Sequence, residues 1–398
     1  MLDPQSTEQV PAVDTRDWPA AVVGGVVLWV GIRAVVSVIS LLAVRFGAGP
    51  AALDGDDRPG GFFGLLHHWD SSYFLGVAAQ GYFPPIPAPE SAAFFPGYPL
   101  AARGFTQLIT MGSPTDASLV MSLSLVSAAS SVMAGIVLWR LVDLTQPAGI
   151  APLGTLMFLA GPYAVFLYAN YSESLFLAFA VAGWYCAVRQ RWWLVGLWCA
   201  LATATRINGC FLLAALVVMY VLQRRRAGRR LWAPLSAWVL LGVTGVVGFF
   251  GYLAAHTGDP LTWNTAQAQV WSRSLTWPWQ AFVQTAGRVL FASTVDRRLQ
   301  FALDIVFAAL IVIAILAWIR RRDWPPVVYA GLTLITLTTS FTFVSLARNS
   351  LTLFPLPILV AVVVHQARSR WIGPAVIGCW TGLFLINTTL FALGYWTD

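Results

Sequence analysis

Eleven apolar segments, separated mostly by short polar connections, constrain this chain more than any other feature of its sequence. Apolar runs of this length and number cannot all lie beneath a polar surface, because 58% of the 398 residues are hydrophobic and only 10% are charged. We therefore predict an all-α polytopic membrane protein with about eleven transmembrane helices. Their expected ranges are 19–46, 117–139, 149–169, 172–188, 192–208, 209–223, 232–255, 301–319, 325–347, 351–366 and 372–395.

Outside these segments, the sequence has a polar start and two long connections. Residues 1–17 are polar and mostly acidic, which predicts a disordered cytoplasmic tail and not a cleaved signal peptide. Residues 18–398 are expected to form a single integral membrane domain. Its long loops are 47–116, whose aromatic second half predicts interfacial helices, and 256–300, which is rich in tryptophan.

The distribution of arginine predicts the orientation. Thirteen arginines lie on connections of one parity, which indicates the cytoplasmic side. Both long loops and the C-terminus are then outside. We attribute the net charge of +7 to this topology and not to nucleic-acid binding. The four cysteines lie singly in apolar segments, so neither a zinc site nor a disulfide framework is predicted.

Chemistry is expected in residues 65–100, where an acid and two histidines lie among aromatic residues. Asp70 follows Trp69 directly, and aromatic and aliphatic residues from Tyr73 to Ala78 are spaced to line one face of a helix along the bilayer surface. The alternative is an interfacial aromatic anchor with an incidental acid.

Polar residues from distant segments are expected at the same outer ends of the spans. Beside Asp70 these are Asn170 and Glu173 in YANYSESLF, Arg206 and Asn208 in TATRING, and Arg348 in SLARNS. Ionisable groups at membrane depth usually face a cavity or each other, so two acids and two arginines suggest one polar chamber that opens outward. The alternative is that each residue caps its own helix at headgroup level.

A family resemblance rests on five stretches: HWDSSYFLGVAAQGY, FFPGYPL, YSESLF, ATRING and ARNSLTLFPLPIL. In this order and hydrophobic frame, the chain resembles the PIG-V family of mannosyltransferases, within the GT-C class of membrane glycosyltransferases. The match runs from about residue 65 to 210, with a weaker C-terminal part. His68 and Ile207 stand where arginine and serine are expected in relatives. The 24 basic residues are all arginine, which suggests a bacterial member.

The resemblance implies transfer of mannose from a polyprenyl-phosphate-mannose donor to a hydroxyl of a lipid-linked or glycan acceptor, with inversion and with neither metal nor cofactor. Asp70 would be the catalytic base, and Arg206 and Arg348 would bind the lipid phosphate. Glu173 could orient the acceptor, hold an arginine or replace Asp70 as base. The other candidate substrate-binding residues are His68, Trp69, Tyr73, Tyr98, Asn170 and Asn208.

The expected location is the cell membrane, as a multi-pass protein whose active site is extracytoplasmic. The bilayer, the donor and the acceptor are the expected partners, and nucleic acid is not. A transporter or flippase for a lipid-linked or anionic substrate is the alternative function, although the sequence shows no inverted repeat. A structural membrane protein would not need charges gathered at one face.

Overall fold

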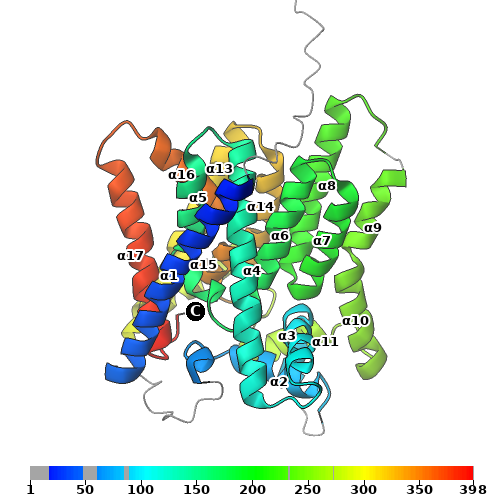
Figure 1. Ribbon diagram of the computed structural model, residues 1–398, viewed down its shortest axis with the longest axis vertical. Coiled ribbons are helices and arrows are strands. Elements are labelled where there is room, and N and C mark those ends of the chain that lie inside the picture. Colours follow the sequence, from blue (N-terminus) through cyan, green and yellow to red (C-terminus); the bar gives the residue numbers. More distant parts are fainter. Residues whose placement is uncertain (1–17, 48–60, 85–88, 232–233, 272, 398) are drawn as a thin grey trace, which may run out of the picture.

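The computed structural model describes residues 18–47, 61–84, 89–231, 234–271 and 273–397. Within these ranges it consists of α-helices and short 3-10 helices, without a β-strand, so the all-α prediction is confirmed (Figure 1). The predicted tail 1–17 lies outside the described residues.

Every one of the eleven predicted apolar segments contains helix. Among the described residues, four helices are each long and apolar enough to cross a membrane, and a pair bent by 83°, Leu346–Thr352 with Pro355–Gln366, would make a fifth. The chain is thus a multi-pass membrane protein, and the number of eleven spans stays a prediction. The helices are α1 (Trp18–Phe46), α4 (Asp116–Thr145), α5 (Ile150–Leu159), α6 (Glu173–Val188), α7 (Trp192–Thr205), α8 (Asn208–Arg226), α9 (Trp238–Gly242), α10 (Thr244–Thr257), α13 (Val295–Arg320), α14 (Trp324–Thr338), α16 (Pro355–Gln366) and α17 (Ile372–Ala392).

The core surrounds α6, which is buried on nearly every side. A helix that is apolar all round has no polar face to expose, so it occupies the centre of a bundle. α6 packs between α4 and α7, and Figure 1 shows these helices side by side. α4 begins with a capping box in which Thr115 and Ser118 satisfy each other's backbone N–H groups.

The two long loops form short helices at one end of the bundle. From the first loop come η3 (Gly61–Gly64), α2 (Ser71–Gln80), η4 (Pro89–Ala93) and α3 (Gly97–Ile109), and from the second α11 (Thr262–Trp271) and α12 (Pro278–Phe291). Figure 1 shows α2, α3 and α11 at the bottom, and the arginine-rich end of α8 and the α16–α17 connection at the top. Arginine-rich connections and aromatic loops therefore lie at opposite ends.

Several helix boundaries differ from the sequence prediction. α7 ends at Thr205 and α8 begins at Asn208, with extended backbone at Arg206 between them, so Asn208 belongs to the second helix. A Cβ on Gly209 would lie 2.5 Å from the backbone nitrogen of Thr203, so glycine is needed for α8 to pack against the end of α7.

A second difference lies in the segment 325–347, where α14 ends at Thr338. The hydroxyls of Thr338 and Thr339 donate to backbone carbonyls one turn earlier, as the hydroxyl of Thr333 does inside the same helix. Residues beyond this end lead into α15 (Leu346–Asn349) and η7 (Ser350–Thr352). The interruption gives Arg348 a place inside the bundle.

Candidate active site

Two carboxylates and two guanidinium groups from four different segments meet in one cluster. Arg348 Nη1 lies 3.0 Å from Asp70 Oδ2, and Arg348 Nη2 lies 2.7 Å from Glu173 Oε1. Arg206 Nη1 lies 3.0 Å from the same oxygen of Glu173. The convergence expected from the sequence is therefore confirmed, and these residues are not independent helix caps.

Arg348 is the centre of this cluster. Its guanidinium carbon lies 4.5 Å from the centroid of the Phe166 ring and 4.6 Å from that of Tyr171. Aromatic faces attract a cation and hold its plane, and the two carboxylates fix its edges. With only 8% of its side chain exposed, Arg348 is a fixed element of the site.

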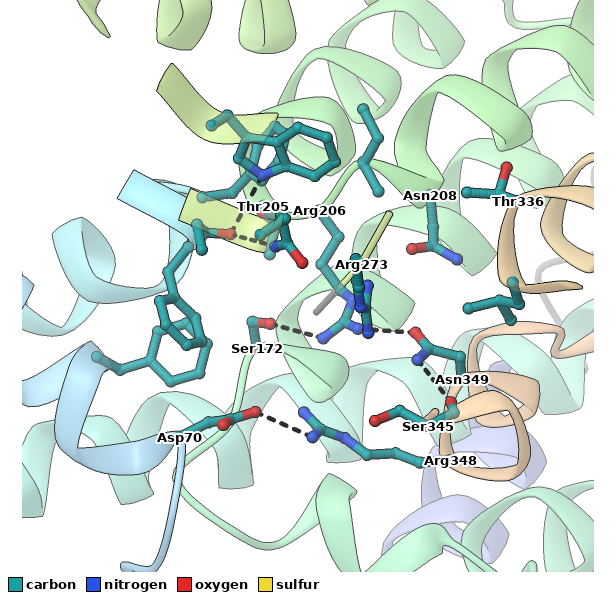
Figure 2. A pocket seen from close by; sticks show the side chains of 18 of the residues that line it. Asp70, Ser172, Thr205, Arg206, Asn208, Arg273, Thr336, Ser345, Arg348 and Asn349 are labelled. Carbon is teal, nitrogen blue, oxygen red and sulfur yellow. Dashed lines mark hydrogen bonds and ion pairs between the residues drawn. The ribbon is translucent and has the colours of Figure 1, made fainter. Parts of the chain in front are cut away.

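Arg206 extends from the break between α7 and α8 toward a cavity. Its Nη1 donates to Ser172 Oγ at 2.9 Å and its Nη2 to Asn349 Oδ1 at 3.0 Å. Figure 2 shows Arg206 between Ser172 and Asn349, with Arg273 beside it. Its partners thus position a guanidinium at the cavity wall.

The cavity measures about 130 Å³ and brings four predicted residues together. Asp70, Arg206, Asn208 and Arg348 line it, whereas Glu173 is fully buried behind the arginines and does not. Asp70 is the acid that lines this wall among the described residues. The geometry therefore separates the two candidate bases: Asp70 reaches the space where a substrate could lie, and Glu173 holds the two arginines.

The backbone preceding two of these residues adopts a sparsely populated conformation. Trp69, directly before Asp70, has a φ of 55°, and Ser345, which precedes the helix of Arg348, has a φ of 60°. Left-handed backbone costs about 1–3 kcal/mol for residues other than glycine and is concentrated at functional sites. These less favourable backbone conformations occur where the chain directs Asp70 and Arg348 toward each other.

Five other sequence candidates do not line the cavity. The Tyr98 hydroxyl donates to the carbonyl of Leu123 at 2.9 Å within the core, and Asn170 bonds to Ser124 and His67. Tyr73 stacks on Phe94, 4.9 Å between centroids, so it supports a cavity residue without lining the space. His68 and Trp69 make edge contacts with Phe391 and Trp396.

The predicted interfacial helix is also partly revised. α2 buries Phe74, Val77 and Ala78 as expected, whereas Tyr73 is only partly buried and stacks on Phe94. Phe94 therefore links the exposed side of α2 to the cavity.

Sequence reasoning gave no specific site role to four residues that line the cavity, Phe94, Trp263, Arg273 and Trp396. Trp263 and Arg273 belong to the second long loop, 256–300, which is rich in tryptophan. Trp263 Nε1 donates to the carbonyl of Ala93 at 3.2 Å, which joins the second loop to the first. The sequence feature that could have indicated a site role for this loop was its concentration of tryptophan and arginine.

A metal site is not suggested by the side chains of the described residues. No group of three or more His, Cys, Asp or Glu side chains has the proximity that metal ligation needs in that part of the chain. The cluster is instead two ion-paired acids and two arginines around an open space.

Such a helical bundle with charged side chains beneath aromatic loops is similar to a solved membrane glycosyltransferase. The crystal structure of ArnT from Cupriavidus metallidurans bound to undecaprenyl phosphate superposes with a TM-score of 0.53 at 18% identity, over 89% of this chain and 62% of that one. The chain thus has the fold of the GT-C membrane glycosyltransferases.

The sequence comparisons show similarity over part of the chain. Residues 53–227 match the family model described as Mannosyltransferase (PIG-V). GPI alpha-1,6-mannosyltransferase 2 is 36% identical over 153 residues in Mus musculus and 35% over 156 residues in Homo sapiens. The alignments cover 37% of this chain and only 30% of each relative. Asp70, Glu173 and Arg206 lie inside the family match, and Arg348 lies outside it.

Proposed function

We propose that this protein transfers mannose from a polyprenyl-phosphate-mannose donor to a hydroxyl of a lipid-linked or glycan acceptor. The observation that carries the proposal is that Asp70, Arg206 and Arg348 line one cavity. The matching family model and the similar proteins are named mannosyltransferases, which supports mannose as the transferred sugar. The undecaprenyl phosphate bound to ArnT in its crystal structure supports a polyprenyl phosphate carrier.

In the proposed reaction, Asp70 is the general base. A hydroxyl is a weak nucleophile, and a carboxylate within hydrogen-bond distance takes its proton as the new bond forms. The acceptor oxygen attacks the anomeric carbon of mannose on the face opposite the phosphate. The bond between that carbon and the phosphate oxygen breaks, and the electron pair leaves with the polyprenyl phosphate. A single displacement of this kind inverts the anomeric configuration and needs only one essential base.

Arg206 is the leading candidate for the donor phosphate. Arg348 already contacts two carboxylates and two aromatic rings, so its donors are largely committed. Arg206 lines the cavity with Arg273 beside it in Figure 2, which brings two guanidinium groups to one wall. The planar fork of arginine fits phosphate oxygens and stabilises charge that develops on the leaving group.

The reaction is proposed to occur on the extracytoplasmic face of the cell membrane. The support is the separation of the arginine-rich α8 end from α2, α3 and α11 in Figure 1, since short arginine-rich connections stay in the cytoplasm. The single membrane domain proposed for 18–398 then carries its active site between the outer helices and the bundle.

The test is mannosyl transfer by protein purified into lipid nanodiscs, with polyprenyl-phosphate-[³H]mannose as donor and membrane lipid extract as acceptor. Asp70→Asn preserves shape but cannot accept the proton, so we expect a loss of about a hundredfold or more in kcat. Asp116→Asn, at an exposed first turn of α4, is the matched control and should keep wild-type activity. Near wild-type transfer by a folded Asp70→Asn variant would overturn the assignment of the base. In sealed proteoliposomes, donor that crosses the bilayer with its mannose still attached would instead support the transporter alternative.

A further inference from the structure

A buried tyrosine adjoins the residues that hold the two arginines of the cluster. Glu173 pairs with both arginines, and Ser172 accepts a hydrogen bond from Arg206. Tyr171 lies directly before them in the chain and is only 1% exposed. It does not line the cavity, so any effect of Tyr171 on the reaction must pass through the residues that it contacts.

The hydroxyl of Tyr171 holds the turn that leads to Asp70. It donates to the backbone carbonyl of His68 at 3.0 Å. The same carbonyl accepts from the backbone N–H of Ser71 at 3.1 Å, so one oxygen both closes the turn and ties it to the bundle. Trp69 lies inside this turn with a φ of 55°, which is unfavourable for a residue other than glycine. A strained conformation persists only where surrounding contacts fix it, and this hydrogen bond is such a contact.

The ring of Tyr171 contacts the arginine that pairs with Asp70. The guanidinium carbon of Arg348 lies 4.6 Å from the ring centroid. Phe166 and Phe391 make edge contacts with the same ring, with centroids 5.0 Å and 5.9 Å away, and these contacts fix its plane. One side chain thus touches both the turn that carries Asp70 and the guanidinium that donates to it.

The backbone of Tyr171 is itself fixed to the core of the bundle. Its carbonyl accepts from Ser127 Oγ of α4 at 3.4 Å, and its N–H donates to the carbonyl of Ala169 at 2.8 Å. The turn that its hydroxyl holds belongs instead to the first long loop. Tyr171 therefore joins an element of the core to the loop residue that is the proposed base.

We propose that Tyr171 is a positioning residue that holds Asp70 against Arg348. This rests on the proposed function, in which Asp70 takes the proton of the acceptor hydroxyl. A displacement of about 1 Å in a reacting group can reduce the rate by about a hundredfold, so a hydrogen bond made outside the cavity can determine kcat. The affinity for the donor should not depend on Tyr171, because Arg206 is held by other side chains.

The test compares transfer by two tyrosine variants of the full chain in nanodiscs. Tyr171→Phe removes the hydrogen bond to His68 and keeps the ring on Arg348. We expect kcat to fall by about tenfold to a hundredfold, with KM for the polyprenyl-phosphate-mannose donor unchanged. Tyr168→Phe is the matched control, because Tyr168 is 2% exposed and its hydroxyl donates to the carbonyl of Leu159 at 3.0 Å, away from the cluster. This control should lose comparable stability and keep wild-type kcat.

Hydrogen exchange gives a second measurement that does not require transfer. The backbone N–H groups of residues 71–74 donate to carbonyls within the turn that Tyr171 holds. These amides should exchange several-fold faster in Tyr171→Phe than in the wild type or in Tyr168→Phe. Unchanged exchange at 71–74 in Tyr171→Phe would overturn the proposal.

A double variant shows whether Tyr171 acts through Asp70. Tyr171→Phe combined with Asp70→Asn should transfer no more slowly than Asp70→Asn alone, because a base that is already absent cannot be misplaced. Losses that multiply in the double variant would overturn the proposal, as would a kcat that is unchanged in Tyr171→Phe or equally reduced in Tyr168→Phe. If no protein transfers mannose, the wild type included, but exchange at 71–74 still depends on Tyr171, only the proposed reaction is wrong.

Discussion

Arg348 follows Asp70 by 278 positions, and yet its Nη1 donates to Asp70 Oδ2 at 3.0 Å. The contact joins the first long loop to the interrupted helix near the C-terminus. Because Glu173 accepts from the same guanidinium, one side chain connects the proposed base to the buried acid. The active-site cluster is therefore also a tertiary contact, and its members are expected to affect both stability and catalysis.

Glu173 should matter more for stability than Asp70. Its Oε1 is the shared counter-charge of Arg206 and Arg348, and the side chain is fully buried. Glu173→Gln leaves two buried arginines with one carboxylate, so we expect a loss of about 3–5 kcal/mol in the free energy of unfolding. Asp70→Asn should cost less because Asp70 pairs with one arginine and reaches the cavity. Denaturant titration of both variants, with Asp116→Asn as reference, shows which substitution lowers the free energy of unfolding more. A Glu173→Gln variant as stable as the wild type but without transfer would make Glu173 the base.

Arg206 should determine the affinity for the donor. Arg206→Lys keeps the charge but loses the bidentate fork, and we expect KM for the polyprenyl-phosphate donor to rise by about tenfold, with Arg206→Ala worse. An additional fall in kcat would indicate that the guanidinium stabilises charge confined to the transition state. Arg229→Ala, at the exposed run after α8, controls for loss of a positive charge. Unchanged donor kinetics in a folded Arg206→Ala variant would remove Arg206 from the site.

The glycine of FFPGYPL should be required for the position of Arg206. A Cβ on Gly97 would lie 2.9 Å from the carbonyl oxygen of Ala204 and 3.0 Å from the Cα of Thr205, directly before Arg206. Gly97→Ala must push α3 away from α7, at a cost of about 1–3 kcal/mol, and should reduce transfer. Gly104→Ala, in the same helix, meets nothing within 4 Å and serves as the matched control. Equal stability and activity of the two variants would show that the close approach has no role.

The proposed orientation can be measured by labelling of single cysteines in intact cells. In a protein whose four native cysteines are replaced, Ser113→Cys lies between α3 and α4 and Arg229→Cys follows α8, both at exposed positions. An impermeant maleimide should react with the first in intact cells and with the second only after permeabilisation. The reverse pattern would place the cavity on the cytoplasmic side and contradict the extracytoplasmic proposal.

His67 should make the fold sensitive to acid. Burial lowers the pKa of its imidazole to about 4, while an unfolded histidine titrates near its ordinary value of 6.5. The unfolded state therefore binds a proton first as the pH falls, and stability should decrease from about pH 6.5 toward pH 4. His67→Gln should reduce the difference in unfolding free energy between pH 7.5 and pH 5. His365→Gln, an exposed histidine in the last turn of α16, should leave that difference unchanged. An equally steep pH dependence in His67→Gln would exclude this cause.

The segments that form helix could be predicted because helix and hydrophobicity are local properties. Apolar runs such as 19–46 and 117–139 coincide closely with α1 and α4, and short apolar segments still contain helix. Breaks inside apolar runs were harder to predict. α14 ends at Thr338 within a run rich in threonine, and threonine is also an ordinary residue within apolar segments.

The residues of the cluster could also be predicted, because charge at membrane depth is costly and its positions along the spans can be counted. Asp70, Glu173, Arg206 and Arg348 were expected at one end, and they meet there. The individual roles could not be predicted, since both acids have the same chemistry and both lie near helix starts.

The sequence by itself determined that this chain is an all-helical membrane protein, which acids and arginines are available to pair, and the similarity of residues 53–227 to the PIG-V mannosyltransferase family model. Only the tertiary structure decided that Asp70 faces the cavity while Glu173 lies behind it, and that Tyr171 contacts both the turn before that base and Arg348. The physical reason is that the tendency to be buried and the charge follow from residue type. The direction of a side chain depends on backbone turns, such as the left-handed one at Trp69, and on packing between helices far apart in the chain.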